Sequence, residues 1–336
     1  MIPDFAGRHQ AAPIMALARG FMASRILLTA FDLDIFTALD RGPIDSVQAA
    51  RRIRCDNRAT DRLLNALVSL GLTRKKGRLF SNTPLAARHL VRGRPEYLAG
   101  LGHCVHLWDS WSTLTAAVRR GRSVLEPSVG RRGAAWLSAF ISAMHERARA
   151  QADAVVKGLD LGAVESVLDV GGGSGAYAMA FVRAKPGLRA TVFDLPQVAP
   201  LTRRYISREG LSGRVAVRAG DYEKDPLPKG FELVLLSAII HSNSPTANIR
   251  LLRKCRRSLN PGGRIVIQDF VMNPDRTAPA FGAIFALNML TATAAGDTYT
   301  ESEIRSWLKQ AGFGSIKRRD TPFASTLIVG SRSGKS

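Results

Sequence analysis

A glycine-rich turn between an apolar run and a helical pattern constrains the fold of this 336-residue chain more than any other feature. The apolar run 167–170 is followed at once by five residues, 171–175, of which four are glycine. Glycine lets a ligand approach the backbone, and the free N–H groups at the start of the next helix favour an anionic group. The turn therefore predicts a strand–turn–helix unit that binds a ligand.

Beyond residue 164 the chain alternates short apolar runs with helix-length segments. Strands separated by helices imply a parallel sheet with helices on both faces. A short turn around Pro322 separates the last two runs, which predicts a terminal antiparallel hairpin. The runs predicted as strands are 164–170, 190–193, 215–219, 233–237, 264–269, 316–319 and 325–329. The predicted fold class is α/β, with a Rossmann-like sheet.

The first part of the chain is predicted to be helical. Apolar residues recur every three or four positions over 16–39, and Asp45 and Asn57 are suited to cap two shorter helices. A hairpin over 72–82 completes the order helix, helix, helix, hairpin. This is the order of a winged helix, which contacts DNA in some proteins and serves packing and dimerisation in several enzymes.

One long predicted helix, 134–158, separates the two patterns. It follows further helical segments and a loop rich in glycine and arginine, and the strand pattern begins directly after it. A typical domain size of about 150 residues also suggests two domains. We therefore expect a helical, winged-helix domain over 1–155 and a sheet domain over 156–336.

The net charge of +21 raises nucleic acid or an anionic surface as a partner. The excess is spread over both halves: residues 1–150 hold 23 basic and 11 acidic residues (+12), and residues 151–336 hold 25 and 16 (+9). Such dispersion fits solubility at least as well as a binding stripe. We expect no nucleic-acid partner, although the basic residues of 51–62 and 74–76 leave DNA-backbone contact open.

The N-terminus and the cysteines indicate a reducing, aqueous compartment. Residues 1–10 lack an apolar core flanked by basic residues, and no run approaches the roughly 18 apolar residues of a membrane span. Cys55, Cys104 and Cys255 lie far apart, so neither a disulfide framework nor a thiolate zinc site is indicated. We expect a cytoplasmic protein that binds neither a membrane nor a metal ion.

Polar residues follow the ends of the predicted strands. Asp194 lies 23 residues after Gly171, where an acid usually holds the hydroxyl pair of a ribose. Asp221 and Tyr222 follow the third strand and are suited to bracket an adenine, and Ser237 ends the fourth. Ligands bind beyond the carboxyl ends of the strands in such sheets, so these residues are expected to face one crevice.

Two adenosine-containing cofactors fit this pattern. Gly171, Gly173 and Ala176 satisfy the looser dinucleotide fingerprint of NAD enzymes. The full set of motifs, however, resembles the large family of S-adenosylmethionine (SAM)-dependent O-methyltransferases typified by plant caffeate and bacterial antibiotic or pigment enzymes. The motifs that carry the resemblance are 168–175, 193–196, 220–222, the segment of His241, and 259–263. The resemblance covers nearly the whole chain and implies that the winged helix is an intertwined dimerisation domain.

The resemblance also implies a cofactor site, residue by residue. The positions assigned to SAM are Gly171 and Gly173 at the methionine end, Asp194 and Leu195 at the ribose, Asp221 and Tyr222 at the adenine, and Ser237 along the wall. Phe140 and Met144 either line the same pocket or belong to the core of their helix. The implied assembly is a homodimer, and the implied cofactor product is S-adenosylhomocysteine.

Methyl transfer to a hydroxyl needs orientation and a base from the protein, because the cofactor supplies the leaving group. A histidine suits this task, since its unperturbed pKa of about 6.5 lies near working pH. His241 follows the fourth strand by a few residues. The resemblance implies that His241 is the base and that Asp269 orients it. We predict methyl transfer to a hydroxyl of a small, largely apolar acceptor of aromatic, polyketide or pigment type.

The chain departs from the family pattern around its histidine. Many relatives carry Asp-Trp where this chain has Ser242 and Asn243, and a second family acid falls on Thr298, with Asp297 beside it as a substitute. Some members of the fold methylate carbon or nitrogen, or use SAM without methyl transfer. These alternatives stay open for this chain.

The acceptor pocket is expected beside a helical region over 278–295. The apolar residues that we expect to shape it are Phe281, Phe285, Met289 and Leu290. Two rival functions come from other classes. A winged-helix regulator with a ligand-sensing domain predicts salt-dependent DNA binding, and an NAD-dependent oxidoreductase gives no account of the motif 220–222.

Overall fold

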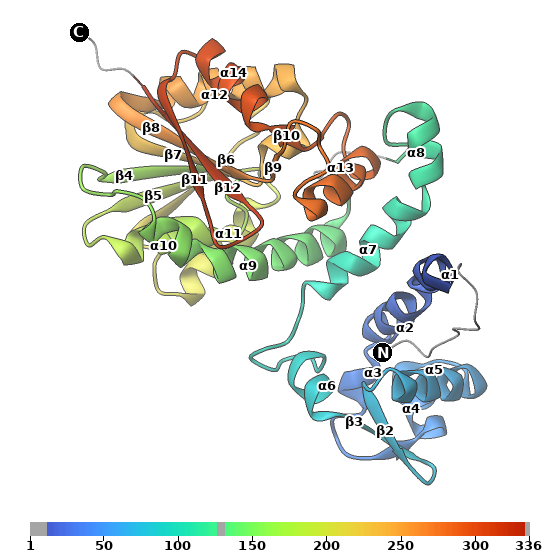
Figure 1. The fold of residues 1–336 in the computed structure, drawn as a ribbon. Helices are drawn as coiled ribbons and strands as arrows, with labels where there is room; N and C mark the ends of the chain where they lie inside the picture. The colour runs from blue at the N-terminus through green and yellow to red at the C-terminus, as the bar shows by residue number, and fades with distance from the viewer. Residues whose placement is uncertain (1–11, 126–131, 333–336) are drawn as a thin grey trace. The chain divides into compact units, whose positions relative to one another are not determined.

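A computed structural model describes residues 12–125 and 132–332 (Figure 1). They form two compact units that divide between Leu107 and Trp108. The long helix α9 (Ala134–Lys157) belongs to the second unit, where its C-terminal half packs in the same hydrophobic cluster as the sheet. The two units thus divide earlier in the chain than the domain boundary predicted at 155/156, and the assignment of domains to 1–155 and 156–336 stays a prediction.

The first unit begins with three helices where the apolar pattern predicts one. They are α1 (Ala12–Arg19), α2 (Phe21–Asp32) and α3 (Ile35–Ala38). Gly20 separates the first two, and Asp34, which has a left-handed φ of 57°, separates the second from the third. The apolar periodicity therefore continues across two helix ends, so periodicity alone does not reveal where the helices stop.

The rest of the first unit follows the winged-helix order. Asp45 caps α4 (Ser46–Ile53) through a complete capping box with Gln48, as its residue type predicts. Asp56, rather than the predicted Asn57, caps α5 (Asn57–Ser69), because its carboxylate accepts the Ala59 N–H at 2.8 Å. The remaining elements are β1 (Ile44–Asp45), β2 (Thr73–Lys76), β3 (Leu79–Asn82), α6 (Pro84–His89) and α7 (Leu101–Ser112), which spans the junction of the units.

A seven-stranded sheet of order β11-β12-β8-β7-β4-β5-β6 organises the second unit. The five strands from β8 to β6 are parallel, whereas β12 pairs antiparallel with both β8 and β11, which confirms the predicted terminal hairpin. The strands are β4 (Ser166–Val170), β5 (Arg189–Asp194), β6 (Val215–Ala219), β7 (Phe231–Ser237), β8 (Leu259–Asp269), β11 (Gly314–Asp320) and β12 (Thr326–Ser331). This sheet confirms the α/β fold class.

Helices cover both faces of the sheet (Figure 1). One core cluster joins α9 and α10 to one face, and another joins α12 and α14 to the opposite face. The helices of this unit, besides α9, are α8 (Leu114–Arg120), α10 (Ala176–Ala184), α11 (Ala199–Arg208), α12 (Pro245–Ser258), α13 (Ala280–Ala292) and α14 (Glu301–Gln310). Two further short strands, β9 (Val271–Met272) and β10 (Tyr299–Thr300), pair beside the sheet. The carboxyl ends of five parallel strands therefore open at one edge.

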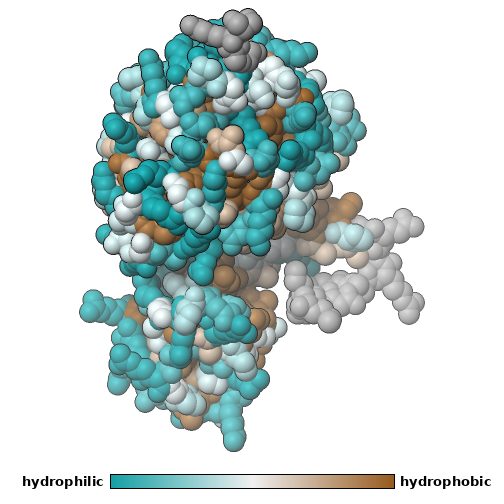
Figure 2. Space-filling model, turned by 90° about the vertical axis from the view of Figure 1, so that its left-hand side faces the viewer, coloured by the Kyte–Doolittle hydropathy of each residue, from teal (hydrophilic) through white to brown (hydrophobic). Residues whose placement is uncertain are grey.

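The surface is mostly hydrophilic on the face drawn in Figure 2, in line with a charge that is dispersed along the chain. The first two helices are an exception. Their exposed large apolar residues are Ile14, Met15, Leu17, Phe21 and Met22. Within the described part of the chain, Ala12–Asp32 is also the one helical segment long and apolar enough to cross a membrane by length and composition. Arg19 and Arg25 interrupt its apolar residues.

Candidate active site

The glycine-rich turn after β4 encloses a buried carboxylate. Asp169 is 1% exposed, and neither of its oxygens accepts a hydrogen bond from a described residue. A Cβ on Gly172 would lie 2.5 Å from Asp169 Oδ2, so this position has no room for a side chain. Burial and then the charge of Asp194 raise the pKa of Asp169 to about 7, and the Ala178 N–H opposes this in part without reaching hydrogen-bond geometry. A cationic group of a ligand would stabilise this carboxylate.

Asp194, at the end of β5, lies against the same turn. Its two oxygens accept the N–H groups of Gly173 and Leu195, both at 2.7 Å. Burial raises the pKa of Asp194 to about 6, although the two N–H groups oppose the shift. The structure thus brings together four of the predicted cofactor residues, since Gly171, with a φ of +68°, begins the same turn.

The predicted adenine pair follows β6. The Asp221 carboxylate accepts the Glu223 N–H at 2.9 Å and pairs with Lys224 at 3.0 Å. The Tyr222 hydroxyl donates to Asn243 Oδ1 at 3.1 Å, and burial raises the pKa of this hydroxyl. Asn243 therefore links the Tyr222 loop to the segment of His241.

The end of β7 is held by a polar network that the sequence did not reveal. Ser237 Oγ donates to Gln268 Oε1 at 3.1 Å, and the Gln268 amide donates to Gln151 on α9 and to Ser325. Burial raises the pKa of Tyr177, whose hydroxyl faces Ser237 and Gln268. Ser237 thus lies at the end of β7 within a set of residues from four different elements, and its contact with the cofactor stays a prediction.

His241 and Asp269 form a buried pair. His241 lies in a short 3₁₀ turn (Ile240–Ser242) after β7, and Asp269 ends the neighbouring strand β8. His241 Nδ1 and Asp269 Oδ1 are 2.7 Å apart, and the two residues are 7% and 4% exposed. The Phe270 N–H also donates to Asp269 Oδ1, at 2.8 Å. The contact fixes the orientation of the imidazole and, with Nδ1–H as the donor, leaves Nε2 as a proton acceptor.

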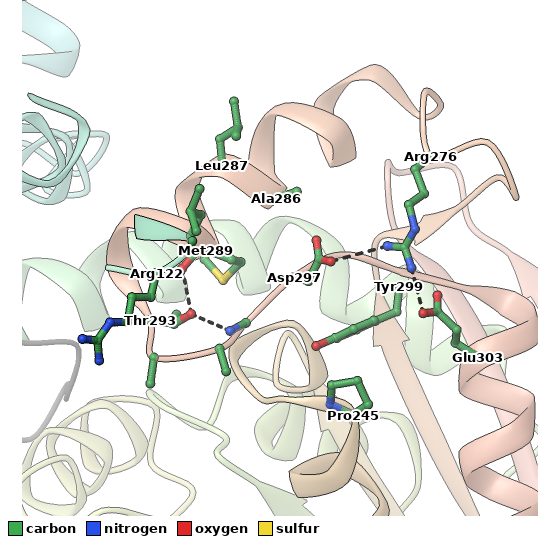
Figure 3. Close-up of a pocket in the computed structure, with 15 residues that line it drawn as sticks. Arg122, Pro245, Arg276, Ala286, Leu287, Met289, Thr293, Asp297, Tyr299 and Glu303 are labelled. Atoms are coloured by element: carbon green, nitrogen blue, oxygen red, sulfur yellow. Dashed lines mark hydrogen bonds and ion pairs between the residues drawn. The ribbon is translucent and has the colours of Figure 1, made fainter. Parts of the chain in front are cut away.

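The loop after α13 contacts the backbone of His241. The Asp297 N–H donates to the His241 carbonyl at 3.0 Å, and a Cβ on Gly296 would lie 2.3 Å from that same oxygen. The Asp297 carboxylate is directed to Arg276 at 3.5 Å (Figure 3). Thr298 is buried and donates its N–H to Asp297 Oδ1. Asp297 therefore meets His241 through its backbone, and its carboxylate has another partner.

Aromatic rings line the region beside His241. The Phe285 ring from α13 lies edge-on to the imidazole at 4.8 Å, and Phe270 contacts both Phe285 and Phe281. Met289 and Leu290 instead line a pocket of about 460 Å³ that lies between α13 and the 293–297 loop (Figure 3). The residues around that pocket do not include His241. The four apolar residues predicted to shape one pocket thus face two regions.

One face of α9 lies against the glycine-rich turn. His145 Nδ1 and Ser174 Oγ are 2.8 Å apart, and Ile141 is the nearest side chain to the Cβ position of Gly173. Phe140 packs in a small apolar cluster that includes Leu195, so it lies next to a predicted cofactor residue. Met144 is half-buried on the same helix, and its role stays a prediction.

These elements can hold a cationic, adenosine-containing ligand at the strand ends. The turn provides a close backbone approach, Asp169 provides a buried carboxyl group without a hydrogen-bond partner among the described residues, and the carboxyl group of Asp194 lies against the same turn. The described residues hold no group of three histidine, cysteine or acidic side chains placed to bind an ion. The fold and this site fit a SAM-dependent methyltransferase.

Comparisons with known proteins specify the family. The O-methyltransferase domain matches residues 111–314, and the O-methyltransferase dimerisation domain matches residues 15–92. The chain therefore belongs to the SAM-dependent O-methyltransferase family. This membership decides between the two cofactors in favour of SAM, and it assigns most of the apolar segment 12–32 to a dimerisation domain.

Named relatives cover nearly the full chain. A 3-hydroxy-5-methyl-1-naphthoate 3-O-methyltransferase of Streptomyces sahachiroi is 32% identical over 94% of this chain and 93% of that protein. A tetracenomycin polyketide synthesis 8-O-methyltransferase of Streptomyces glaucescens is 31% identical over 94% and 95%. The crystal structure of human N-acetylserotonin methyltransferase in complex with SAM has a TM-score of 0.84 and 26% identity, over 99% of this chain and all of that one.

Gly296→Ala should slow methyl transfer while SAM binding is kept. The added methyl group has no room beside the His241 carbonyl, so the turn that carries the imidazole must move. We expect turnover to fall by about tenfold or more, since small misplacements of reacting groups are costly. Steady-state kinetics and SAM titration measure the two effects. Ala295→Gly, which adds no atom, is the control, and wild-type turnover in Gly296→Ala would contradict the steric argument.

Asp169 should make the ligand-free protein less stable as pH rises. Between its ordinary value of 3.8 and its folded pKa of about 7 the folded state holds a proton that the unfolded chain has released. The free energy of unfolding should therefore fall by about 1.4 kcal/mol per pH unit in this range. Urea unfolding at pH 5 and pH 7 should show a larger loss for the wild type than for Asp169→Asn. Equal losses would refute the raised pKa.

Proposed function

We propose that His241 removes the proton of the acceptor hydroxyl during methyl transfer and that Asp269 orients it. The observation that carries this proposal is the 2.7 Å contact between His241 Nδ1 and Asp269 Oδ1. With Nδ1 as donor to a carboxylate, Nε2 carries the lone pair that a general base needs, and the carboxylate stabilises the imidazolium that forms. Both groups are buried, which strengthens this interaction.

The crevice residues are proposed to hold SAM, which when bound supplies an electrophilic methyl group on a sulfonium. Gly171 and Gly173 would hold the methionine end, and Asp169 would balance its positive charge. The other proposed contacts are Asp194 and Leu195 to the ribose, Asp221 and Tyr222 to the adenine, and Ser237 along the wall. Support comes from the convergence of all seven predicted positions, and of Asp169, on the carboxyl edge of the sheet.

The proposed acceptor is a hydroxyl on an aromatic or polyketide ring system. The aromatic side chains beside His241 suit a flat, apolar body, and relatives named above act on a hydroxynaphthoate and in tetracenomycin polyketide synthesis. Deprotonation by a histidine also suits a phenolic or enolic hydroxyl better than an alkyl alcohol, because less basic oxygens lose their proton near neutral pH.

We further propose a homodimer formed through the first unit. The dimerisation domain covers residues 15–92, and α1 and α2 expose a row of apolar residues that a second copy would bury. Exposed apolar surface of this kind marks an association site in many proteins. We also propose that the protein is cytoplasmic, as the sequence predicts.

His241→Ala should lower turnover by roughly 10² to 10⁴-fold, the usual contribution of general-base catalysis. Asp269→Ala should lower turnover less, because the imidazole remains but loses its orientation. Both variants should bind S-adenosylhomocysteine with nearly wild-type affinity, measured by calorimetry. His89→Ala, which replaces a half-buried histidine of the first unit, is the control. Full activity in His241→Ala would remove the base assignment and leave the family assignment intact.

Asp194→Ala should weaken SAM binding with every acceptor, since it removes the carboxylate assigned to the ribose and frees the Gly173 N–H from its partner. We expect the Kd to rise by about tenfold or more, as for loss of a charged hydrogen bond. Asp153→Ala, an exposed acid on α9, should leave the Kd unchanged. An unaltered Kd in Asp194→Ala would exclude the ribose assignment.

A further inference from the structure

Two lines of residues on α9 face different parts of the second unit. Ile141 and His145, four residues apart, lie against the glycine-rich turn. Gln151, six residues after His145, instead meets Gln268 near the end of β8, at 3.2 Å. Arg147 lies one helical turn before Gln151, on the same side of the helix, and about 200° around the axis from His145. Arg147 is therefore directed to the end of β8 rather than to the glycine-rich turn.

The Arg147 guanidinium lies on an aromatic ring that leads to the histidine. Its Cζ is 4.7 Å from the centroid of the Phe270 ring. Phe270 and Phe285 are 4.9 Å apart, and Phe285 lies against the His241 imidazole at 4.8 Å. Arg147 thus ends a line of rings that begins at the proposed base.

Arg147 has no anionic partner within the described part of the chain. No hydrogen bond or ion pair joins it to a described residue, although the side chain is half-buried. Burial lowers the pKa of Arg147. The nearby Asp269 and Tyr177 oppose this shift, because their negative charge favours the protonated guanidinium. Asp269 does not come within ion-pair distance of Arg147, and its Oδ1 accepts hydrogen bonds from His241 and from the Phe270 N–H.

A half-buried guanidinium without an anionic partner is suited to bind an anionic group of a ligand. It offers five N–H donors in a planar arrangement that matches a carboxylate, and a partly desolvated charge gains more from pairing than an exposed one. The ring beneath it stabilises the cation but accepts none of these hydrogen bonds. The position therefore fits an acidic group attached to an aromatic body.

We propose that Arg147 binds a carboxylate on the acceptor and thereby holds the acceptor hydroxyl at His241, so that the preferred substrates are aromatic hydroxy acids. This inference rests on the proposed function, since it concerns the acceptor of that reaction. Phe270 and Phe285 lie between the cation and the base. The buried Phe270 ring supports the guanidinium, and the half-buried Phe285 offers apolar contact to the ring of such an acid. Arg147 is then a specificity-determining residue and takes no part in proton transfer.

The test compares an acid with its neutral counterpart. Full-length protein saturated with S-adenosylhomocysteine is titrated calorimetrically with 3-hydroxy-1-naphthoic acid and with 3-hydroxy-1-naphthamide. The proteins compared are the wild type, Arg147→Gln, Arg147→Lys and Arg149→Gln. Arg149 is exposed on the same helix and provides a matched control. Binding of S-adenosylhomocysteine is measured separately for each protein.

The wild type should bind the acid about 10 to 100-fold more tightly than the amide, the range expected for a charged hydrogen-bonded pair. Arg147→Gln should abolish this preference without changing the affinity for the amide or for S-adenosylhomocysteine. Arg147→Lys should keep part of the preference, and Arg149→Gln should keep all of it.

Three results would overturn the proposal: failure of the acid to bind, equal binding of acid and amide by the wild type, or a preference that survives in Arg147→Gln. A loss of S-adenosylhomocysteine affinity in Arg147→Gln would instead assign the cation to the carboxylate of the cofactor, which also contradicts the proposal. These binding measurements do not depend on turnover. A failure of the His241 experiment therefore remains distinguishable from a failure here.

Discussion

The position of Asp269 determines the geometry of the proposed reaction centre. This residue ends β8, a strand held between β7 and β12 by backbone pairing on both sides. Its carboxylate contacts the His241 imidazole across the top of the neighbouring strand. The imidazole is confined further by the Phe285 ring and by the loop that passes Gly296. The central strand β8 thus holds the His241 side chain in place, although His241 itself lies in a short 3₁₀ turn.

The sequence predicts the sheet well because its signal is local. The parallel strands are short apolar runs, and helices follow all of them except β6, which leads to β7 through a loop. Element type and order can therefore be read largely without tertiary information. The breaks at Gly20 and Asp34 are harder to predict, since the apolar period runs through both. The cap of α5 is shifted by one residue because Asp56 and Asn57 are both good caps, and only the folded backbone selects between them.

Some residues of the site can likewise be predicted from the sequence, and others cannot. Gly171, Asp194, His241 and Asp269 are predictable because each follows a strand at a characteristic spacing and matches a family motif. Asp169 lies within the first of these motifs, but its unpaired burial depends on Gly172 and on the packing around it. Arg147, Tyr177 and Gln268 carry no motif, and they meet only because α9, α10 and β8 converge in space. The sequence signal for Arg147 is a charge on a helical face whose other residues are uncharged.

The buried carboxylate of Asp169 has a consequence for the energetics of ligand binding. With a pKa of about 7, this group is partly protonated in the ligand-free protein at neutral pH. A cation that binds beside it favours the ionised form, so a proton is released to the solvent as the ligand enters. The heat of binding then contains the ionisation enthalpy of whatever buffer accepts the proton. Occupancy of the crevice and the acidity of the surrounding medium are in this way thermodynamically linked.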